Sequence, residues 1–109
     1  MGMATFLMIS RHTPDKCPFF NEAARKAYID FYANKSFSKH GVKLLGAWSV
    51  SSEHQNYLLF EAPSVEAIQK AGMEPDFLAI WASETAEIKL AMGMEEAMKM
   101  LKQFASVTT

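Results

Sequence analysis

The chain has 109 residues, 50% of them apolar, with 11 basic and 12 acidic side chains and a formal net charge of −1. This length accommodates one domain with one hydrophobic core, and the apolar content predicts a folded protein rather than a disordered one. The balanced charge gives no electrostatic reason to bind nucleic acid or an anionic membrane, and no apolar run is long enough to span a bilayer. The opening residues lack the features of a signal peptide and the single cysteine cannot form an internal disulfide, so we expect a cytoplasmic protein.

The first third of the chain predicts a strand followed by a helix. Residues 4–10, ATFLMIS, are short, apolar and suited to a β-strand. RHTPDKCP then supplies turn-forming residues, and from about Phe19 to Lys39 the apolar residues recur at helical spacing. The expected apolar stripe consists of Phe20, Ala23, Ala24, Ala27, Tyr28 and Phe31.

The middle of the chain predicts a β-hairpin and a short helix. Residues 42–50, VKLLGAWSV, and residues 56–62, NYLLFEA, have strand composition, and the polar SSEHQ between them is short enough for a hairpin turn. Ser64 is expected to cap a helix over residues 64–72. We expect residues 73–84, MEPDFLAIWASE, to form an irregular or one-turn helical link.

The last part of the chain predicts a fourth strand and a closing helix. Residues 85–92, TAEIKLAM, alternate between apolar and polar, Gly93 ends the strand, and residues 94–104, MEEAMKMLKQF, follow with helical spacing. The apolar face of this helix predicts packing in the core or at a dimer interface. Its members are Met94, Ala97, Met98 and Leu101.

This order of elements, βαββαβ with an extra C-terminal helix, is that of the ferredoxin-like α+β fold, whose antiparallel sheet has the strand order 4-1-3-2. We expect a single ferredoxin-like domain over residues 1–109, with its core at residues 4–92 and the C-terminal helix at residues 93–104.

Both faces of the predicted sheet are apolar. In the first strand Phe6 and Met8 point to one face while Leu7 and Ile9 point to the other. Because helices cover only one face of this fold, the second face needs another cover, and the simplest is the same face of a second subunit. We therefore expect a homodimer through the sheet face.

These features together resemble the dimeric α+β barrel superfamily. The resemblance rests on the order of elements, the two-faced sheet, the hairpin AWSVSSEHQNYLLFEAPS leading into a short helix, and the late strand EIKLAM, and it spans residues 4 to about 92. The superfamily includes antibiotic-biosynthesis-type monooxygenases, haem-degrading monooxygenases, muconolactone isomerase-like enzymes and small metal-binding proteins. The resemblance implies a ferredoxin-like subunit that forms a dimeric barrel.

The predicted topology gathers reactive side chains at one end of the sheet. The first strand ends at RHTPDKC, the turn SSEHQ lies at the same edge, and the link MEPDFLAIWASE returns there. The gathered side chains are His12, Cys17, Glu53, His54, Trp81 and Glu84, whereas His40 belongs to the opposite end. Neighbouring strands are about 4.8 Å apart, so side chains of the first and second strands can reach a shared ligand.

Imidazole and thiolate are donors for borderline transition metals, so His12, Cys17 and His54 predict a zinc, nickel or copper site. The alternative is a pair of loop histidines beside a cysteine that packs like a small apolar residue, because the spacing matches no zinc signature. Small metal-binding relatives that use His and Cys from comparable loops agree with the first interpretation. We expect a small ligand-binding protein with a transition-metal site.

A cofactor-light monooxygenase or isomerase for a small planar organic substrate is an alternative function. Such an enzyme requires a base and an apolar cavity. His54 or His12 would be the base because the imidazole pKa lies near neutrality, and Tyr28, Tyr32 or Trp48 would line the cavity.

Haem is a further alternative, with Trp48, Trp81 and Tyr28 as candidate cofactor-binding residues. A single histidine in an aromatic pocket suffices as an axial ligand. The resemblance implies a His, an Asn and a Trp around the porphyrin in haem-degrading relatives, but this chain has Ser10 where the Asn would match best. A reaction at the Cys17 thiol is weaker still, because no oxyanion-hole motif accompanies it.

Overall fold

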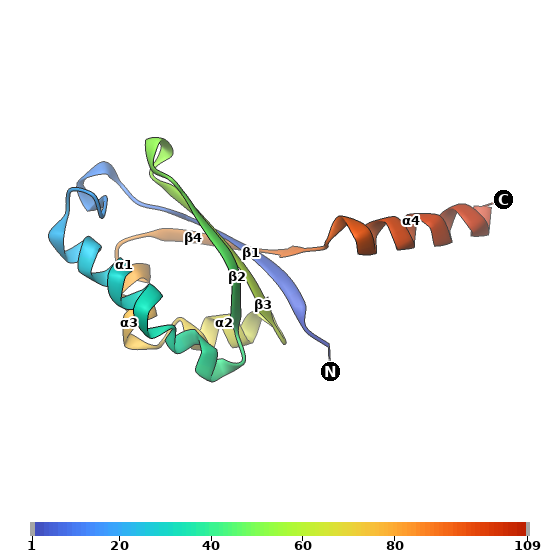
Figure 1. Ribbon diagram of the computed structural model, residues 1–109, viewed down its shortest axis with the longest axis horizontal. Coiled ribbons are helices and arrows are strands. Elements are labelled where there is room, and N and C mark those ends of the chain that lie inside the picture. Colours follow the sequence, from blue (N-terminus) through green and yellow to red (C-terminus); the bar gives the residue numbers. More distant parts are fainter. Residues whose placement is uncertain (1, 109) are drawn as a thin grey trace.

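The computed structural model describes residues 2–108, and the side chains as far as residue 106. A four-stranded sheet with the order β2-β3-β1-β4 carries helices α1, α2 and α3 on one face, while α4 projects away from it (Figure 1). Every neighbouring pair of strands is antiparallel. The strands are β1 (Ala4–Arg11), β2 (Lys43–Val50), β3 (Gln55–Ala62) and β4 (Thr85–Ala91). The predicted ferredoxin-like fold and strand order are confirmed.

Helix α1 (Glu22–Asn34) is shorter than the predicted helix over residues 19–39. It begins at Glu22 because the Asn21 side chain accepts a hydrogen bond from the Ala24 N–H at 2.9 Å, which satisfies a free donor of the first turn. It ends where Lys35 adopts a left-handed φ of 49°. Phe20 lies before the helix with 84% of its surface exposed, so its assignment to the apolar stripe was wrong.

Helix α2 (Val65–Ala71) begins as predicted, since the Ser64 hydroxyl accepts a hydrogen bond from the Ala67 N–H at 3.2 Å. The segment expected to be an irregular or one-turn helical link contains a longer helix of seven residues, α3 (Pro75–Trp81). Pro75 suits the first helical position because it lacks an N–H, and Phe77 is buried to 1% exposure. Burial of this aromatic side chain fixes α3 against the core.

Aromatic rings form the centre of the core between the sheet and the helices. The ring centroid of Phe31 lies 4.9 Å from that of Phe77 and 5.4 Å from that of Phe37, which in turn lies 5.7 Å from Phe60. Phe31, Phe60 and Phe77 are each at most 2% exposed. Tilted and edge-on aromatic contacts of this kind add to the stabilisation from burial.

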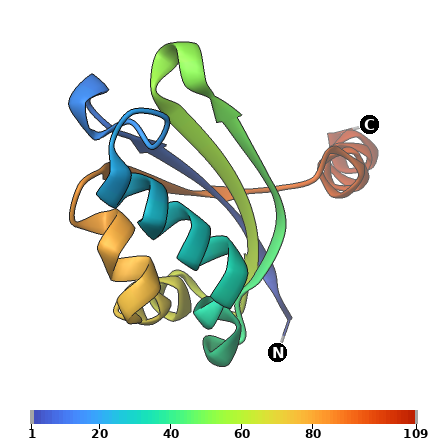
Figure 2. The ribbon, with the colours of Figure 1, turned by 60° about the vertical axis from the view of Figure 1, so that its left-hand side comes forward.

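The other face of the sheet carries no helix (Figure 2). Leu7 pairs with Leu59, Ile9 pairs with Tyr57, and Trp48 of β2 pairs with Tyr57 across the next ladder. Trp48 keeps 59% of its surface exposed. This set of residues is called the open face below, and it is the apolar second face that the sequence predicted.

Helix α4 (Met94–Thr108) closes the chain and extends beyond the predicted end at residue 104. It was expected to pack in the core or at a dimer interface, but within this chain it stands clear of the sheet and the other helices (Figure 1). Among the described helices, none combines the length and the apolarity needed to cross a bilayer.

Replacing Phe60 by Ala tests the aromatic core. Phe60 is 0% exposed, so Phe60→Ala should lower the free energy of unfolding by about 3–5 kcal/mol through lost burial and a residual cavity. Phe20→Ala removes the same group from a position that is 84% exposed and should change it by less than about 0.5 kcal/mol. Urea unfolding followed by circular dichroism measures both. Equal losses in the two variants would contradict this core.

Candidate functional site

The site begins where the β1–β3 ladder ends. Arg11 is the last residue of β1, and the next residue, His12, donates its backbone N–H to the His54 carbonyl oxygen at 3.1 Å. His54 closes the short turn between β2 and β3 with a left-handed φ of 54°. The two imidazole rings therefore lie together, with centroids 5.3 Å apart and planes at 74°.

Cys17 reaches the two histidines from the turn that follows His12. Residues Pro14–Lys16 form a short 3₁₀ helix, and the Cys17 carbonyl accepts backbone hydrogen bonds from Phe20 and Asn21 at 2.9 and 2.7 Å. These bonds hold the cysteine inward, and only 2% of its surface is exposed. One ligand atom from each of His12, Cys17 and His54 lies within 4.8 Å of the other two.

Two of the imidazole nitrogens have unmet hydrogen-bonding capacity. His12 Nε2 and His54 Nδ1 are both buried and have no hydrogen-bond partner in the described chain. A buried polar atom without a partner costs about 1–3 kcal/mol. The buried thiol and these two nitrogens are the donor atoms that zinc, nickel and copper accept, so the residues fit a transition metal.

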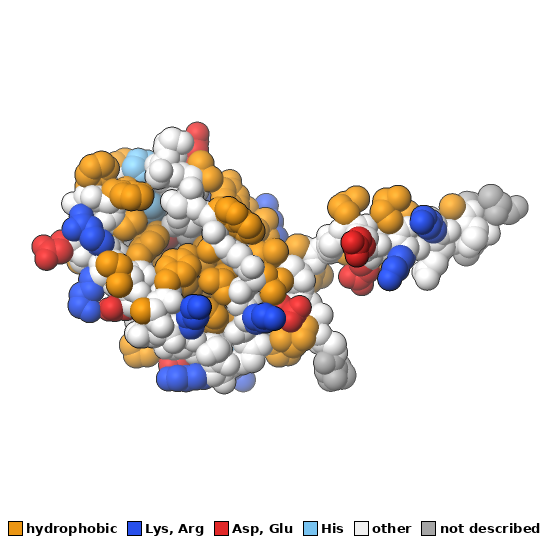
Figure 3. Space-filling model, in the orientation of Figure 1, with side chains coloured by type: hydrophobic (Ala, Val, Ile, Leu, Met, Phe, Trp, Pro, Cys, Tyr) orange, Lys and Arg blue, Asp and Glu red, His pale blue; other side chains and the backbone are white. Residues whose placement is uncertain are grey.

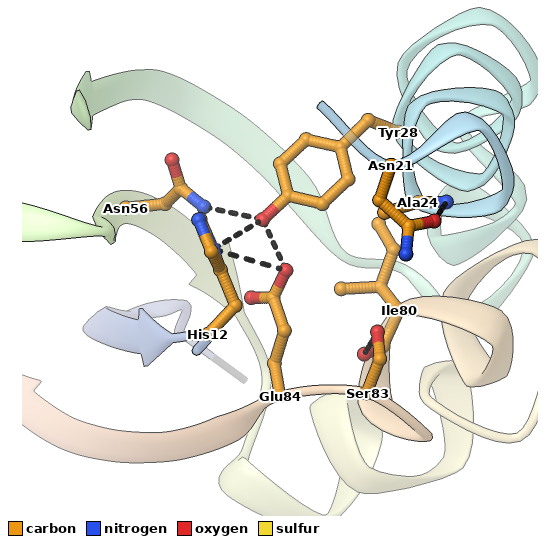
Figure 4. Close-up of polar contacts among 8 residues, drawn as sticks. All are labelled: His12, Asn21, Ala24, Tyr28, Asn56, Ile80, Ser83 and Glu84. Carbon is orange, nitrogen blue, oxygen red and sulfur yellow. Dashed lines mark hydrogen bonds and ion pairs between the residues drawn. The ribbon is translucent and has the colours of Figure 1, made fainter. Parts of the chain in front are cut away.

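The other ring nitrogen of His12 faces a buried polar cluster, drawn in Figure 4. His12 Nδ1 lies 3.4 Å from the Tyr28 hydroxyl and 3.7 Å from Glu84 Oε2. The Tyr28 hydroxyl donates a hydrogen bond to Glu84 and accepts one from Asn56 Nδ2 at 2.6 Å. The side chains of His12 and Glu84 are only 4% and 2% exposed. Residues His12, Tyr28, Asn56 and Glu84 are called the polar cluster below.

Burial sets the protonation of this cluster. It lowers the pKa of His12, an effect that the Glu84 carboxylate opposes and that His54 reinforces. It also raises the pKa of Tyr28 far above its ordinary value, and the hydrogen bond from its hydroxyl to Glu84 raises it further. At neutral pH we therefore expect a neutral His12, with a lone pair available on one nitrogen, and a protonated Tyr28.

Several hollows lie beside the polar cluster and beside Cys17 and His54. A groove of about 440 Å³ runs between α1 and the sheet, with Tyr28, Tyr32, Trp48 and Asn56 in its wall. A cavity of about 20 Å³, large enough for one water molecule, lies behind it. Its lining includes Tyr28, Tyr32, Asn56, Trp81 and Glu84. A third hollow of about 550 Å³ opens over Cys17 and His54 between Phe19, Phe20, Ser51 and Ser52.

The structure brings some of the predicted site residues together and separates others. His12, Cys17 and His54 lie side by side, and Tyr28 contacts the same cluster. Trp48 lines the groove, whereas Trp81 lines the small cavity and packs against Phe77, with ring centroids 5.8 Å apart. The remaining histidine, His40, interacts elsewhere with Glu74 at 2.8 Å. Glu53 is exposed.

Sequence reasoning missed Asn56 altogether. Along β3 the buried positions are Asn56, Leu58, Phe60 and Ala62, so the asparagine occupies an inward position of an otherwise apolar series. A polar residue at such a position predicts a buried hydrogen bond. The alternation of inward and outward positions over residues 56–62 could therefore have identified Asn56 from the sequence. Glu84 was placed at the correct end, but its contact with Tyr28 depends on the path of α3 and could not be read from spacing.

The comparisons agree with the class of fold. The chain superposes on SnoaB, a cofactor-independent oxygenase from Streptomyces nogalater, with a TM-score of 0.50, 17% identity, and coverage of 85% of this chain and 94% of that one. It superposes on a NIPSNAP family protein of unknown function from Agrobacterium tumefaciens with a TM-score of 0.54, 18% identity, and coverage of 83% and 86%. These likenesses agree with the ferredoxin-like α+β fold that the sequence predicted.

The family is defined by a match over nearly the whole chain. Residues 4–105 match a family model described as a domain of unknown function, DUF3303, and the protein belongs to that family. Comparison with curated proteins gives no match.

Tyr28→Phe tests the polar cluster. Removing the hydroxyl leaves Glu84 and Asn56 without their shared partner, so the free energy of unfolding should fall by about 1–3 kcal/mol. Tyr57→Phe is the matched control, because the Tyr57 hydroxyl lies on the other face of the sheet and donates its hydrogen bond to Gln55 Oε1 at 2.9 Å. Thermal and urea unfolding compare the two variants. A loss of stability as large in Tyr57→Phe would mean that the polar cluster contributes no more than an ordinary hydroxyl.

Proposed function

We propose that this protein binds a transition-metal ion through His12, Cys17 and His54. The observation that carries the proposal is that two buried imidazole nitrogens without partners lie beside a buried thiol, with the ligand atoms within 4.8 Å of one another. A metal ion would satisfy both nitrogens at once. The donor set of two imidazoles and one thiolate suits zinc, nickel or copper, whereas calcium and magnesium prefer oxygen.

The spacing of the donors is compatible with coordination. Metal–ligand bonds of about 2.0–2.3 Å in a tetrahedral site put the ligand atoms about 3.3–3.8 Å apart. Closing the site from 4.8 Å therefore takes movements of about 1 Å, within the reach of side-chain rotation. Three protein ligands leave a fourth position, and the hollow over Cys17 and His54 gives that position access to a small molecule.

Glu84 and Tyr28 support the proposal from the far side of His12. A histidine that ligates a metal through one nitrogen commonly donates a hydrogen bond from the other to a carboxylate, which fixes its tautomer and ring orientation. His12 Nδ1 faces the Tyr28 hydroxyl at 3.4 Å and Glu84 at 3.7 Å, so Nε2 remains the ligating atom. In this proposal Glu84 and Tyr28 are positioning residues for the metal ligand.

Metal titration of matched variants tests the proposal. The wild-type chain should bind one Zn²⁺, Ni²⁺ or Cu²⁺, and an ion present at about 100 times its Kd should stabilise the fold by about 2.7 kcal/mol. Cys17→Ser and His54→Ala should each weaken binding more than the 10–100-fold that is typical of an outer-shell change, which is the range expected for Glu84→Gln. With Co²⁺, the thiolate charge-transfer band should be present in the wild type and absent in Cys17→Ser.

His40→Ala is the control for the loss of an imidazole. His40 contacts Glu74 away from the proposed ligands, so its replacement should leave the metal affinity unchanged. Equal affinities of the wild type, Cys17→Ser and His54→Ala by calorimetry would show that any bound metal lies elsewhere, and the proposal would be wrong.

A second candidate function is the binding of a small planar organic molecule in the groove beside α1, as a cofactor-light monooxygenase or isomerase would require. The groove of about 440 Å³ has an aromatic wall and a buried polar floor, which is the usual composition of a ligand pocket. The similarity of fold to a cofactor-independent oxygenase favours the same interpretation. His54 was the sequence candidate for the base, but it lines the neighbouring hollow, and Tyr28 and Asn56 are the polar groups in this wall.

A planar aromatic probe such as acridone tests the groove independently of metal. Phe19→Ala should weaken its binding by roughly tenfold or more, because an aromatic part of the groove wall is removed. Phe20→Ala should not, since Phe20 is the next residue, is 84% exposed and lies outside this groove wall. Fluorescence anisotropy measures both affinities. Binding that is unaffected by Phe19→Ala would remove the groove as the ligand site.

We also propose that the chain forms a homodimer through the open face. The support is an apolar sheet surface without helical cover, on which Trp48 is 59% exposed and Val50, two residues further along β2 and so on the same face, is 36% exposed. Burying such a surface against a second copy is favourable, and an isologous pair is the commonest arrangement of identical subunits. The mass of the particle in solution tests this proposal together with the role of α4.

A further inference from the structure

Helix α4 is an arm that leaves the body of the subunit after β4. Its residues, Met94–Thr108, extend from the sheet edge beyond Gly93 in both ribbon views (Figures 1 and 2). In Figure 2 the sheet lies between α4 and the layer formed by α1 and α3. The arm is therefore on the side of the sheet where the open face is.

The arm is strongly amphipathic. At 100° per residue, Met94, Met98 and Leu101 lie on one side of the helix, and they are 69%, 44% and 55% exposed. The charged residues Glu95, Glu96 and Lys99 lie away from this stripe, and Lys102 flanks it beside Met98. Figure 3 shows hydrophobic side chains gathered along one edge of the arm and acidic ones along the opposite edge. Such a stripe is the pattern of a helix that packs against another surface.

A helix of this length needs that packing to be stable. Isolated helices shorter than about 12–15 residues are marginal in water, and tertiary burial of an apolar face supplies most of the stability of protein helices. Helix α4 has 15 residues. Its order therefore depends on a surface that covers Met94, Met98 and Leu101.

We infer that the apolar stripe of α4 packs against a second copy of this chain, so that two arms clasp a dimer formed through the open faces. The inference rests on the dimer proposed above. Each arm starts at the edge of the open face and extends on that side, so a second copy seated on the face lies within its reach (Figure 2). The interface of the arm would be continuous with the interface of the sheets.

The buried area supports a second copy as the occupant. Four strands spaced about 4.8 Å apart, with seven or eight residues rising about 3.3 Å each, give a face of about 500 Å², so two faces bury about 1,000 Å². A stable interface buries about 1,200–2,000 Å² in total. A helix of 15 residues is about 22 Å long and 10 Å wide, so two docked arms and the surfaces beneath them add about 900 Å². The sheets alone fall short of this range and the clasped dimer reaches it.

Two single substitutions on α4 distinguish a loss of apolar contact at the dimer interface from a general effect of added charge. Leu101→Glu places a carboxylate in the apolar stripe, and Gln103→Glu adds the same charge on the opposite side of the helix. Burying one leucine is worth roughly ten- to a hundredfold in a binding constant, and a symmetric dimer buries two, so Leu101→Glu should raise the dimer Kd by about 100-fold or more. Gln103→Glu should leave it within about threefold. Light scattering and sedimentation of the full-length chain measure both, and circular dichroism verifies folding.

A spin label shows which copy the arm contacts. The label is attached at Gln103→Cys in a Cys17→Ala background, and this chain is mixed with isotopically labelled wild type. Broadening of amide signals of the isotopically labelled chain is the expected result, because the spin-labelled arm of one copy then lies against the body of the other.

Each remaining outcome contradicts the inference. A monomer at micromolar concentration removes both the dimer and the clasp. A dimer that Leu101→Glu does not weaken, without broadening in the mixed sample, keeps the sheet dimer and removes the clasp. Broadening only when both labels are on one chain means that α4 folds back onto its own subunit or serves a different partner.

Discussion

The backbone hydrogen bond between the His12 N–H and the His54 carbonyl, at 3.1 Å, is the contact on which the site depends. It continues the β1–β3 register by one pair beyond Arg11 and Gln55, the last partners of the ladder. Because antiparallel pairing fixes which residues face each other, a slip of one residue would move every side chain of β3 to the other face. The two imidazoles are therefore adjacent because the hydrophobic alternation of two central strands requires it. The same register places Asn56 opposite Ser10 on the inward face.

The fold could be predicted from the sequence because each level of the pattern agreed with the next. Alternation identified the strands, Ser64 marked the start of α2, and the order of elements fixed the topology. The boundaries of α1 could not be predicted in the same way. The apolar residues at helical spacing begin with Phe20, but the Asn21 cap starts the helix after it. Lys35 ends the helix in a left-handed conformation that a lysine rarely adopts. Helix α3 was predicted as an irregular or one-turn helical link because seven residues are too few to show a helical period. The burial of Phe77 stabilises it.

The candidate site also has a part that the sequence predicted and a part that it did not. Topology alone was enough to gather His12, Cys17 and His54, since strand ends and turns at one edge of a sheet must lie near one another. The contacts that Tyr28 and Glu84 make on the other side of His12 could not be predicted from the topology. Tyr28 comes from the middle of α1 and Glu84 from the residues after α3, so their contact depends on how two helices pack over the sheet. Packing angles of this kind follow from side-chain shapes across the whole core rather than from local spacing.

The free-energy cost of buried polar atoms without partners distinguishes metal binding from the binding of an organic molecule in the groove. A domain of this size has a net stability of about 5–15 kcal/mol, so buried polar atoms without partners, at about 1–3 kcal/mol each, are a considerable fraction of it. The described chain has such atoms at His12 Nε2 and His54 Nδ1, near the Cys17 thiol, and two more at Trp81 Nε1 and Glu84 Oε1, beside the small cavity. A molecule in the groove beside α1 would contact Tyr28 and Asn56 and would leave both imidazole nitrogens as they are. A metal ion among the three donors would relieve both. The cost already present in the fold therefore favours the metal, and the polar cluster, which touches His12 on one side and the groove on the other, physically connects the two sites.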